Sequence, residues 1–341
     1  MDVDYELYDD YSQPNDTEYN TNNETVTTNR GLFLFAETQT SLTPVLVTAN
    51  IIVIVLGLGG NSLVIWICGW KMKRTVATTW YISLAVSNWM FCAFLPMNVY
   101  YMITMDWPFG LLLCKLTSSI LFLNMFSSVF LLVLISVDRC AMVTFPVWSH
   151  NHRSPWKASV IVGMTWALSA LFTAPSIVYR HTKVHGSMTV CYTHYNTASE
   201  HKAVAQTRFI CGFIIPFLII VVCGVWLVVQ LKNKTFKSAK PYKIMSALIC
   251  SFFVCWVPYH TFILLELGLE NHSLHVHRTG QKVGATLAAA NSFISPILYV
   301  FLGNDFKTTL KRSLTSRIEA ALSEDLRSGR ASTRSMSMGN L

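Results

Sequence analysis

The sequence predicts an all-α membrane protein: a seven-transmembrane helix bundle with a short amphipathic eighth helix. Of its 341 residues, 52% are hydrophobic and only 13% are charged, about half the charged share of an ordinary soluble domain. Seven runs of at least 20 residues contain no Asp, Glu, Lys or Arg. Basic clusters follow every second run, as expected for a chain that crosses a membrane repeatedly.

Each uncharged run is long enough to span a bilayer, because roughly 20 helical residues cross about 30 Å of hydrocarbon. In order, the runs are 45–68, 75–105, 116–137, 158–179, 209–231, 244–265 and 283–302. Five of the runs contain a proline at Pro96, Pro175, Pro216, Pro258 or Pro296. Neighbouring helices satisfy the carbonyls that a proline frees, so we expect kinks and not helix ends.

Basic residues set the predicted orientation, since Lys and Arg resist translocation. Eighteen lie in the linkers after the first, third and fifth runs and in the tail, whereas six lie on the opposite side. We therefore expect a multi-pass plasma-membrane protein with an extracellular N-terminus and a cytoplasmic C-terminus. The basic clusters are short and separated by apolar runs, which does not favour nucleic-acid binding.

The two ends of the chain differ in composition from the bundle. Residues 1–40 carry nine acidic and one basic side chain, too polar to fold alone. After the last run, Phe306, Leu310 and Leu314 recur every four residues with basic residues between them, which favours a helix lying on membrane lipid. The expected domains are a disordered acidic extracellular tail (1–41), the bundle (42–303), the amphipathic helix (304–316) and a disordered cytoplasmic tail (317–341).

Two features on the predicted outer side agree with this topology. Asn15, Asn23 and Asn271 begin glycosylation sequons on that side. Among nine cysteines, Cys114 and Cys191 are the two placed at or beyond the outer ends of the runs, where a disulfide forms. We expect them to pair and to tie the second outer loop to the third span.

Local patterns, one per run and in order, resemble those of the rhodopsin-like G-protein-coupled receptors. They are Gly60-Asn61, Leu84-Ala85-Val86, Asp138-Arg139-Cys140, Trp166, Phe213 with Pro216, Cys255-Trp256-Val257-Pro258 and Pro296-Ile297-Leu298-Tyr299. Others are similar to the chemoattractant branch, which includes chemerin, formyl-peptide and anaphylatoxin receptors: Asn124-Met125-Phe126, residues 146–153, Arg208-Phe209 and Pro258-Tyr259-His260-Thr261. The tail at Leu322-Ser323-Glu324-Asp325 is most similar to chemerin receptors.

The resemblance implies an activation switch on the cytoplasmic side. Arg139 would pair with Asp138 at rest and turn toward a G protein when the sixth span moves, the alternative being ordinary snorkelling at the interface. Trp256, two residues before Pro258, would couple the ligand pocket to that motion, or would be a plain core aromatic. Tyr299 would join the switch near Arg139 in the active form.

The candidate ligand residues lie near the outer ends of the spans. The planar fork of Arg208 suits a carboxylate of a peptide, and Glu266 suits a cation or would pair with Arg208 instead; the resemblance favours ligand contact for both. Phe122, Tyr259 and Arg180 complete the set. Formyl-peptide receptors carry an acidic residue where this chain has Phe122, which disfavours a formyl-peptide ligand.

Three positions depart from the family pattern. Asn88 stands where Asp is usual, Ser295 replaces the Asn before Pro296, and Gly224 replaces a Tyr that helps to hold the active form. Family members hold a sodium ion with groups at the positions of Asn88, Asn124, Ser128, Asn291, Ser292 and Ser295. A hard cation prefers a carboxylate, so we expect weak sodium binding here, and no other metal and no cofactor.

These features predict a cell-surface receptor without catalytic activity. Its expected partners are a peptide or protein agonist, an inhibitory-class G protein, receptor kinases, arrestin and membrane lipid. The three departures leave open a decoy or scavenging receptor that binds the same ligand and couples weakly. A transporter or intramembrane enzyme is disfavoured, because the middles of the runs hold no ionisable Asp, Glu, Lys or Arg and no hydrolytic motif is present.

Overall fold

The computed structural model describes residues 24–232, 240–266, 274–302 and 308–313, with side chains placed in 42–230, 246–266, 279–298 and 308–313. Its elements are α1 (Glu24–Trp66), η2 (Ile67–Lys71), α2 (Val76–Thr104), α3 (Gly110–Thr144), α4 (Pro146–His152), α5 (Pro155–Val178), β1 (Arg180–His185), β2 (Met188–Thr193), α6 (Ala198–Phe209), η3 (Ile210–Ile214), α7 (Ile215–Lys232), α8 (Lys240–Glu266) and α9 (Leu274–Leu302). The expected glycosylation sites Asn15, Asn23 and Asn271, the N-terminal tail through residue 23 and the C-terminal tail lie outside the described residues.

All seven uncharged runs are helical, which confirms the predicted fold class. The fifth is one continuous span made of α6, η3 and α7. Within the described residues, six helices are long and apolar enough to cross a membrane, and α9 is the seventh helix, packed against α1 and α8. The helices run through their prolines, as at Pro96 in α2 and Pro258 in α8.

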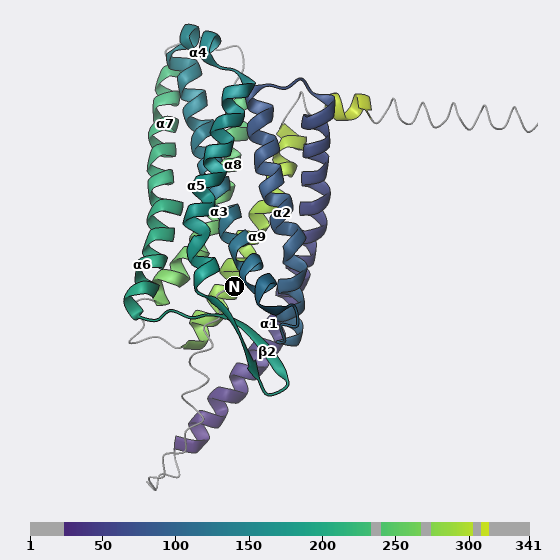
Figure 1. Cartoon of the computed structure of the whole chain (residues 1–341), viewed down its shortest axis with the longest axis vertical. Coiled ribbons are helices and arrows are strands. Elements are labelled where there is room, and N and C mark those ends of the chain that lie inside the picture. Colours follow the sequence, from purple (N-terminus) through teal and green to yellow (C-terminus); the bar gives the residue numbers. More distant parts are fainter. Residues whose placement is uncertain (1–23, 233–239, 267–273, 303–307, 314–341) are drawn as a thin grey trace, which may run out of the picture.

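The helices form a bundle around α3 (Figure 1), which contacts α2, α5, α7 and α8. The short helix α4 lies at one end, here called the α4 end, and the β1–β2 hairpin lies at the other, the hairpin end. Large apolar side chains face outward, as Leu171, Val222 and Val254 do with about 70% of their surface exposed. An apolar exterior over a partly polar interior is the arrangement expected in lipid.

Capping residues set where several helices begin. The Thr75 hydroxyl accepts a hydrogen bond from the Thr78 N–H at 3.1 Å, and the Thr78 hydroxyl accepts one from the Thr75 N–H at 2.8 Å. This reciprocal capping box satisfies two N–H groups at the start of α2. Ser154 caps α5 before Pro155, a position that suits proline because its missing N–H would have no partner there.

The hairpin end is closed by an element that sequence analysis did not predict. β1 and β2 pair antiparallel with Thr182 opposite Cys191, and Gly186 makes the turn with φ of +61°. The predicted disulfide between Cys114 and Cys191 is present and joins α3 to β2. Trp107, 1% exposed, donates its backbone N–H to Thr189 at 2.8 Å, so the hairpin is held against α2 and α3.

The predicted eighth helix is described only in part. Residues 308–313 are helical; Leu310 packs against the core, while Lys311 and Arg312 are exposed. This segment has the amphipathic character expected from the sequence, whereas Phe306 and Leu314 lie outside the described residues.

Candidate functional site

Arg208 lies in the last turn of α6, inside the bundle. Its side chain is buried, with 8% of the residue exposed. The guanidinium carbon stands 3.5 Å from the centre of the Phe122 ring on α3, and Nη2 donates a hydrogen bond to the Ser176 hydroxyl on α5 at 3.0 Å. A guanidinium over an aromatic face is stabilised by the ring quadrupole, so three helices position this cation.

Gly212 explains why the fifth span comes so close to α3. A Cβ built there would lie 2.8 Å from Met125 Cε and 3.0 Å from a ring carbon of Phe126. The glycine lies in η3, a π-helical turn just before Pro216, and such turns re-aim the residues on either side. The absent side chain and the wide turn together seat Arg208 over Phe122.

An aromatic chain leads from Arg208 into the bundle. Ring centres of Phe122 and Tyr259 lie 6.4 Å apart, and those of Tyr259 and Trp256 lie 5.7 Å apart. Phe122, Tyr259 and Trp256 are each at most 3% exposed. The structure therefore brings three of the five candidate ligand residues together with Trp256, two residues before Pro258 on α8.

His260 is a member of this cluster that the sequence reading quoted only as part of a motif. It is 3% exposed, and its ring lies 5.1 Å from that of Phe213 and 6.1 Å from that of Trp256. Its Nε2 has no hydrogen-bond partner among the described atoms. The positive charge of the Arg208 guanidinium lies near enough to interact electrostatically with the imidazole ring of His260. In the sequence, the signal that could have identified His260 is a histidine directly after Tyr259 in a run without Asp, Glu, Lys or Arg.

The two other candidate ligand residues lie at the end of α8 and at the start of β1. Glu266, at the end of α8, accepts a hydrogen bond from Gln281 of α9 at 2.6 Å. Arg180 begins β1 and donates to the Thr193 hydroxyl at 2.7 Å across the hairpin. Arg180 is buried, with 5% of the residue exposed, whereas Glu266 is half-buried.

Neutral hydrogen bonds occupy the positions of the family's sodium site. Asn124 Nδ2 on α3 donates to Asn88 Oδ1 at 2.9 Å and to the Ser87 hydroxyl at 3.1 Å, both on α2. The hydroxyls of Ser87 and Ser127 lie 2.6 Å apart. Asn124 thus presents N–H groups to the oxygens that a cation would need, and no carboxylate lies among them, so these residues do not fit a sodium ion.

The remaining members of that set are also buried. Ser128, Asn291 and Ser295 are each at most 4% exposed, on α3 and α9. The Asn61 amide of α1 donates to the backbone carbonyl of Ser292 at 2.9 Å. Uncharged polar groups therefore join α2 to α3 and α1 to α9 inside the bundle.

At the α4 end, Asp138 pairs with Arg153 and not with Arg139, the partner expected from the sequence. Both of its carboxylate oxygens accept from Arg153, at 2.7 and 2.8 Å, and Arg139 donates instead to the Met142 sulfur at 3.8 Å. The pairing of Asp138 with Arg139 expected at rest is therefore wrong for this structure. Arg153 ends α4, which aims its fork so that both oxygens are held together.

Gly224 and Tyr299 are two further positions of the expected activation switch. Gly224 on α7 has open space where a side chain would begin, since nothing lies within 4 Å of a Cβ built there. Tyr299 lies in α9, and its side chain is outside the described residues. Among the residues that the structure describes, no group of three or more potential metal ligands is found.

Comparison with known proteins gives the same assignment. The family described as "7 transmembrane receptor (rhodopsin family)" matches residues 60–299. Chemerin-like receptor 1 of Mus musculus is 43% identical over 302 residues, covering 82% of this chain and 81% of that protein. C3a anaphylatoxin chemotactic receptor of Oncorhynchus mykiss is 42% identical over 282 residues, covering 80% and 77%. Chemerin-like receptor 2 of Macaca fascicularis is 34% identical over 288 residues. The chain belongs to the rhodopsin family of seven-transmembrane receptors and is a multi-pass membrane receptor, not an enzyme.

Proposed function

We propose that this protein is a cell-surface receptor for a chemerin-like peptide or protein chemoattractant. The observation that carries the proposal is the buried Arg208, whose guanidinium lies over Phe122 at the head of the aromatic chain to Trp256. A buried cation with polar donors directed into a receptor interior suits a ligand carboxylate, either an acidic side chain or a free C-terminus. The names of its relatives, which refer to chemerin and to C3a, support this class of ligand.

The proposed orientation places the hairpin end outside the cell. The disulfide between Cys114 and Cys191 lies there, and disulfides persist in oxidising surroundings. Asp138, Arg139 and Arg153 lie at the opposite end, which we assign to the cytoplasm because basic linkers favour that side. Asn15, Asn23 and Asn271 would then be available for glycosylation outside the cell.

Agonist binding would act through the packed rings. A carboxylate bound to Arg208 draws the guanidinium toward it and changes its contact with Phe122. Because Phe122, Tyr259 and Trp256 are closely packed, a shift of one ring requires the others to repack. The agonist favours the active arrangement only by the difference in its affinity for the two states, and contact with Arg208 supplies that difference.

At the cytoplasmic end, the proposed transducers are an inhibitory-class G protein and then arrestin. Asp138 is held by Arg153, and Arg139 donates to a weaker partner, the Met142 sulfur. A cation held by neutral partners is released at less cost than one in an ion pair. Movement of α8 would therefore free Arg139 for the G protein without first breaking a salt bridge.

The test is a cyclic-AMP assay in cells that express the receptor. The C-terminal peptide of chemerin is expected to lower forskolin-stimulated cyclic AMP, and pertussis toxin to abolish that response. Formyl peptides and C3a are tested beside it. If all three ligands fail to bind, the proposed ligand class is wrong.

Arg208→Ala tests the proposed contact. The variant should weaken a free-carboxylate peptide by about 1.5–3 kcal/mol, roughly 10- to 150-fold, which is the scale of a hydrogen bond to a charged group. The amidated peptide should be barely affected, and Lys202→Ala, an exposed cation on the same helix, is the matched control. Equal losses for both peptides would show that Arg208 is structural.

A decoy receptor is the second candidate, favoured by Gly224. Without the usual tyrosine, the active form would lack one contact to Tyr299, and among the described residues nothing lies within 4 Å of a Cβ built at Gly224. A decoy would bind and internalise the chemerin peptide with no change in cyclic AMP. Ligand uptake without a pertussis-toxin-sensitive response would select this alternative.

A further inference from the structure

The two edges of the β1–β2 hairpin differ in their hydrogen bonding. His194 donates its backbone N–H to the carbonyl of Tyr179 at 2.8 Å, and these two residues lie opposite each other where the register of the hairpin continues beyond its last pair. In an antiparallel pair of strands, hydrogen-bonded and non-hydrogen-bonded positions alternate. Arg180, Thr182 and Val184 therefore direct their backbone groups away from β2, toward the outer edge of β1.

The outer edge of β2 is covered, whereas that of β1 is open. Thr189 of β2 accepts a hydrogen bond from the Trp107 N–H at 2.8 Å and donates its own N–H to the Asp106 carboxylate at 2.7 Å. Within the part of the chain that the structure describes, the outward backbone groups of Thr182 and Val184 have no such partner. Val184 is 71% exposed, and a row of unpaired backbone groups is a template for another strand.

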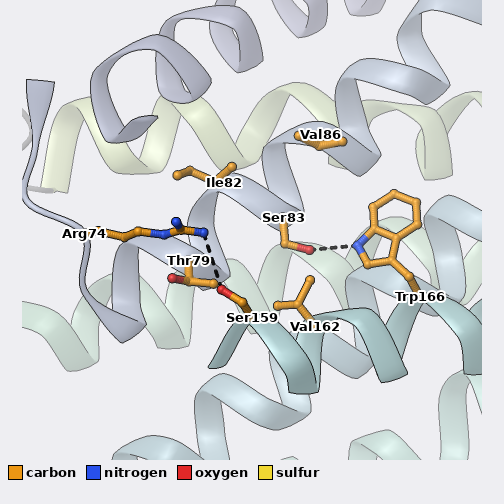
Figure 2. Close-up of a pocket in the computed structure, with 8 residues that line it drawn as sticks. All are labelled: Arg74, Thr79, Ile82, Ser83, Val86, Ser159, Val162 and Trp166. Carbon is orange, nitrogen blue, oxygen red and sulfur yellow. Dashed lines mark hydrogen bonds between the residues drawn. The ribbon is translucent and has the colours of Figure 1, made fainter. Parts of the chain in front are cut away.

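The pocket between α2 and α5 does not offer a comparable opening (Figure 2). There Arg74 Nη2 reaches the Ser159 hydroxyl at 3.5 Å. The Trp166 indole N–H donates to the Ser83 hydroxyl at 2.9 Å. These side chains bond to one another, whereas the open edge of β1 consists of backbone groups that need a partner from outside the hairpin.

One face of β1 is basic. Because successive side chains of a strand point to opposite faces, His181, Lys183 and His185 share one face, and Thr182 and Val184 share the other. Lys183 and His185 are exposed. The hairpin, residues 180–193, contains no acidic residue. β1 therefore combines an open edge with three basic or titratable side chains in a row.

Residues 2–7, which lie outside the described residues, have the complementary pattern in the sequence. They alternate acidic and apolar side chains: Asp2, Val3, Asp4, Tyr5, Glu6 and Leu7. Such alternation is typical of a β-strand with two different faces. A segment too polar to fold alone can become ordered on a partner that matches its charges.

We propose that residues 2–7 add to the open edge of β1 as a third, antiparallel strand, with Asp4 opposite Lys183. The cross-strand pairs in this register are Asp2–His185, Glu6–His181, Tyr5–Thr182 and Val3–Val184. Backbone hydrogen bonds hold a strand added in this way, and the side chains fix its register. A slip by one residue would bring the apolar side chains against the basic face of β1.

The length of the chain allows this contact. α1 begins at Glu24 and, like the hairpin, lies at the hairpin end of the bundle where it starts (Figure 1). Residues 24–41 of α1 precede the membrane span and rise about 27 Å, whereas residues 8–23 reach up to about 55 Å when extended. Because the tail is attached to the chain, its effective concentration is on the order of millimolar, which favours it over a free peptide of equal affinity.

Carbodiimide cross-linking of the full-length receptor tests the contact. The reagent joins a lysine amine to a carboxylate only where the two touch, and mass spectrometry of the peptides identifies the pair. We expect a link between Lys183 and Asp4 and none to Lys202, an exposed cation on α6. In a mixture of isotopically light and heavy receptor, the link should lie within one chain. Links between light and heavy chains would assign the edge to the tail of a second copy and overturn the proposal.

Substitutions separate the strand edge from the charges. Val184→Pro removes an N–H that points away from β2, as proline does on edge strands, and should abolish the link; Val184→Ala keeps the N–H and is the matched control. Amide hydrogen exchange is the second readout. Asp4→Asn should speed exchange at Thr182 and Val184 by up to about five-fold, the range of one cross-strand charge pair. Asp16→Asn, in the same tail, should leave exchange unchanged.

A charge swap provides the rescue. Lys183→Asp combined with Asp4→Lys should restore the link that either substitution alone abolishes. Formation of the Cys114–Cys191 disulfide, measured by mass, verifies that the hairpin is folded in every variant. A link to Lys202 equal to that to Lys183, no link at all, or equal exchange in Asp4→Asn and Asp16→Asn would each overturn the proposal. These readouts need no agonist, so the cyclic-AMP response reports separately on the proposed receptor function.

Discussion

Replacing Asn88 by Asp together with Ser295 by Asn should create a sodium-sensitive receptor from one that is insensitive. In the structure, Asn88 Oδ1 accepts from Asn124 Nδ2 at 2.9 Å, and the same nitrogen donates to Ser87 at 3.1 Å. An entering sodium ion would need those oxygens and would displace both hydrogen bonds. Asn88→Asp adds a carboxylate that compensates for this loss, and Ser295→Asn restores a second oxygen ligand.

The size of the effect follows from those two contacts. Each hydrogen bond is worth about 0.5–1.5 kcal/mol, so displacing both costs about 1–3 kcal/mol, roughly 5- to 150-fold in sodium affinity. A restored site that is filled at about ten times its Kd stabilises the inactive state by about 1.4 kcal/mol, which lowers agonist affinity about ten-fold. A site roughly 100-fold weaker contributes less than about 0.1 kcal/mol at the same salt concentration.

Radioligand competition measures both cases. Agonist affinity of the unmodified receptor should be the same in sodium chloride and in an equal concentration of choline chloride, a comparison that keeps ionic screening constant. The double variant should lose about ten-fold in sodium only. A clear sodium effect in the unmodified receptor, or none in the double variant, would refute the reasoning about the amide network.

The remaining predictions concern the two ends of the bundle. Cys114→Ser or Cys191→Ser should abolish surface expression or ligand binding, because the hairpin would lose its tie to α3; normal binding by both variants, measured by flow cytometry and radioligand, would contradict this. Gly224→Tyr should give Tyr299 one new hydrogen bond of about 0.5–1.5 kcal/mol, which raises agonist potency roughly two- to ten-fold. Unchanged potency in the cyclic-AMP assay would show that Tyr299 gains no contact. Arg153→Ala should lower potency, since Asp138 is then free to pair with Arg139; Lys157→Ala is the control, and equal effects would remove the specific role of Arg153.

The helices were predictable because each span needs a long run without charged residues, and such runs can be read directly from the order of residues in the sequence. The disulfide between Cys114 and Cys191 was predictable for a similar reason, since only their positions relative to the span ends were required. The β1–β2 hairpin was not predicted. Its strands have six residues each and β1 is mostly polar, and the hairpin is held by the disulfide and the Trp107 contact, which are tertiary features.

Within the candidate site, the sequence identified which residues lie together better than it identified which side chains pair with each other. The sequence singled out Arg208, Phe122, Tyr259 and Trp256, and the structure brings them together. The partner of Asp138 was missed because the choice between an adjacent residue and Arg153 depends on where α4 ends. Whether Arg153 reaches Asp138 depends on the direction in which α4 runs relative to α3. Residue spacing within one helix does not predict that direction.

The departures from the family pattern act on opposite sides of the activation equilibrium. We expect the neutral pair of Asn88 and Asn124 to remove a stabiliser of the inactive state, because an ion that barely binds cannot favour either state. Gly224 removes a stabiliser of the active state, because glycine has no hydroxyl to donate. Each change is worth on the order of 1 kcal/mol, so their effects largely offset each other. We therefore expect a receptor that has lost both contacts to keep a resting equilibrium near that of its relatives, with the proposed agonist contact at Arg208 as the main influence on it. The departures on their own therefore do not require a decoy, and weak coupling would have to arise at the cytoplasmic surface around Arg139.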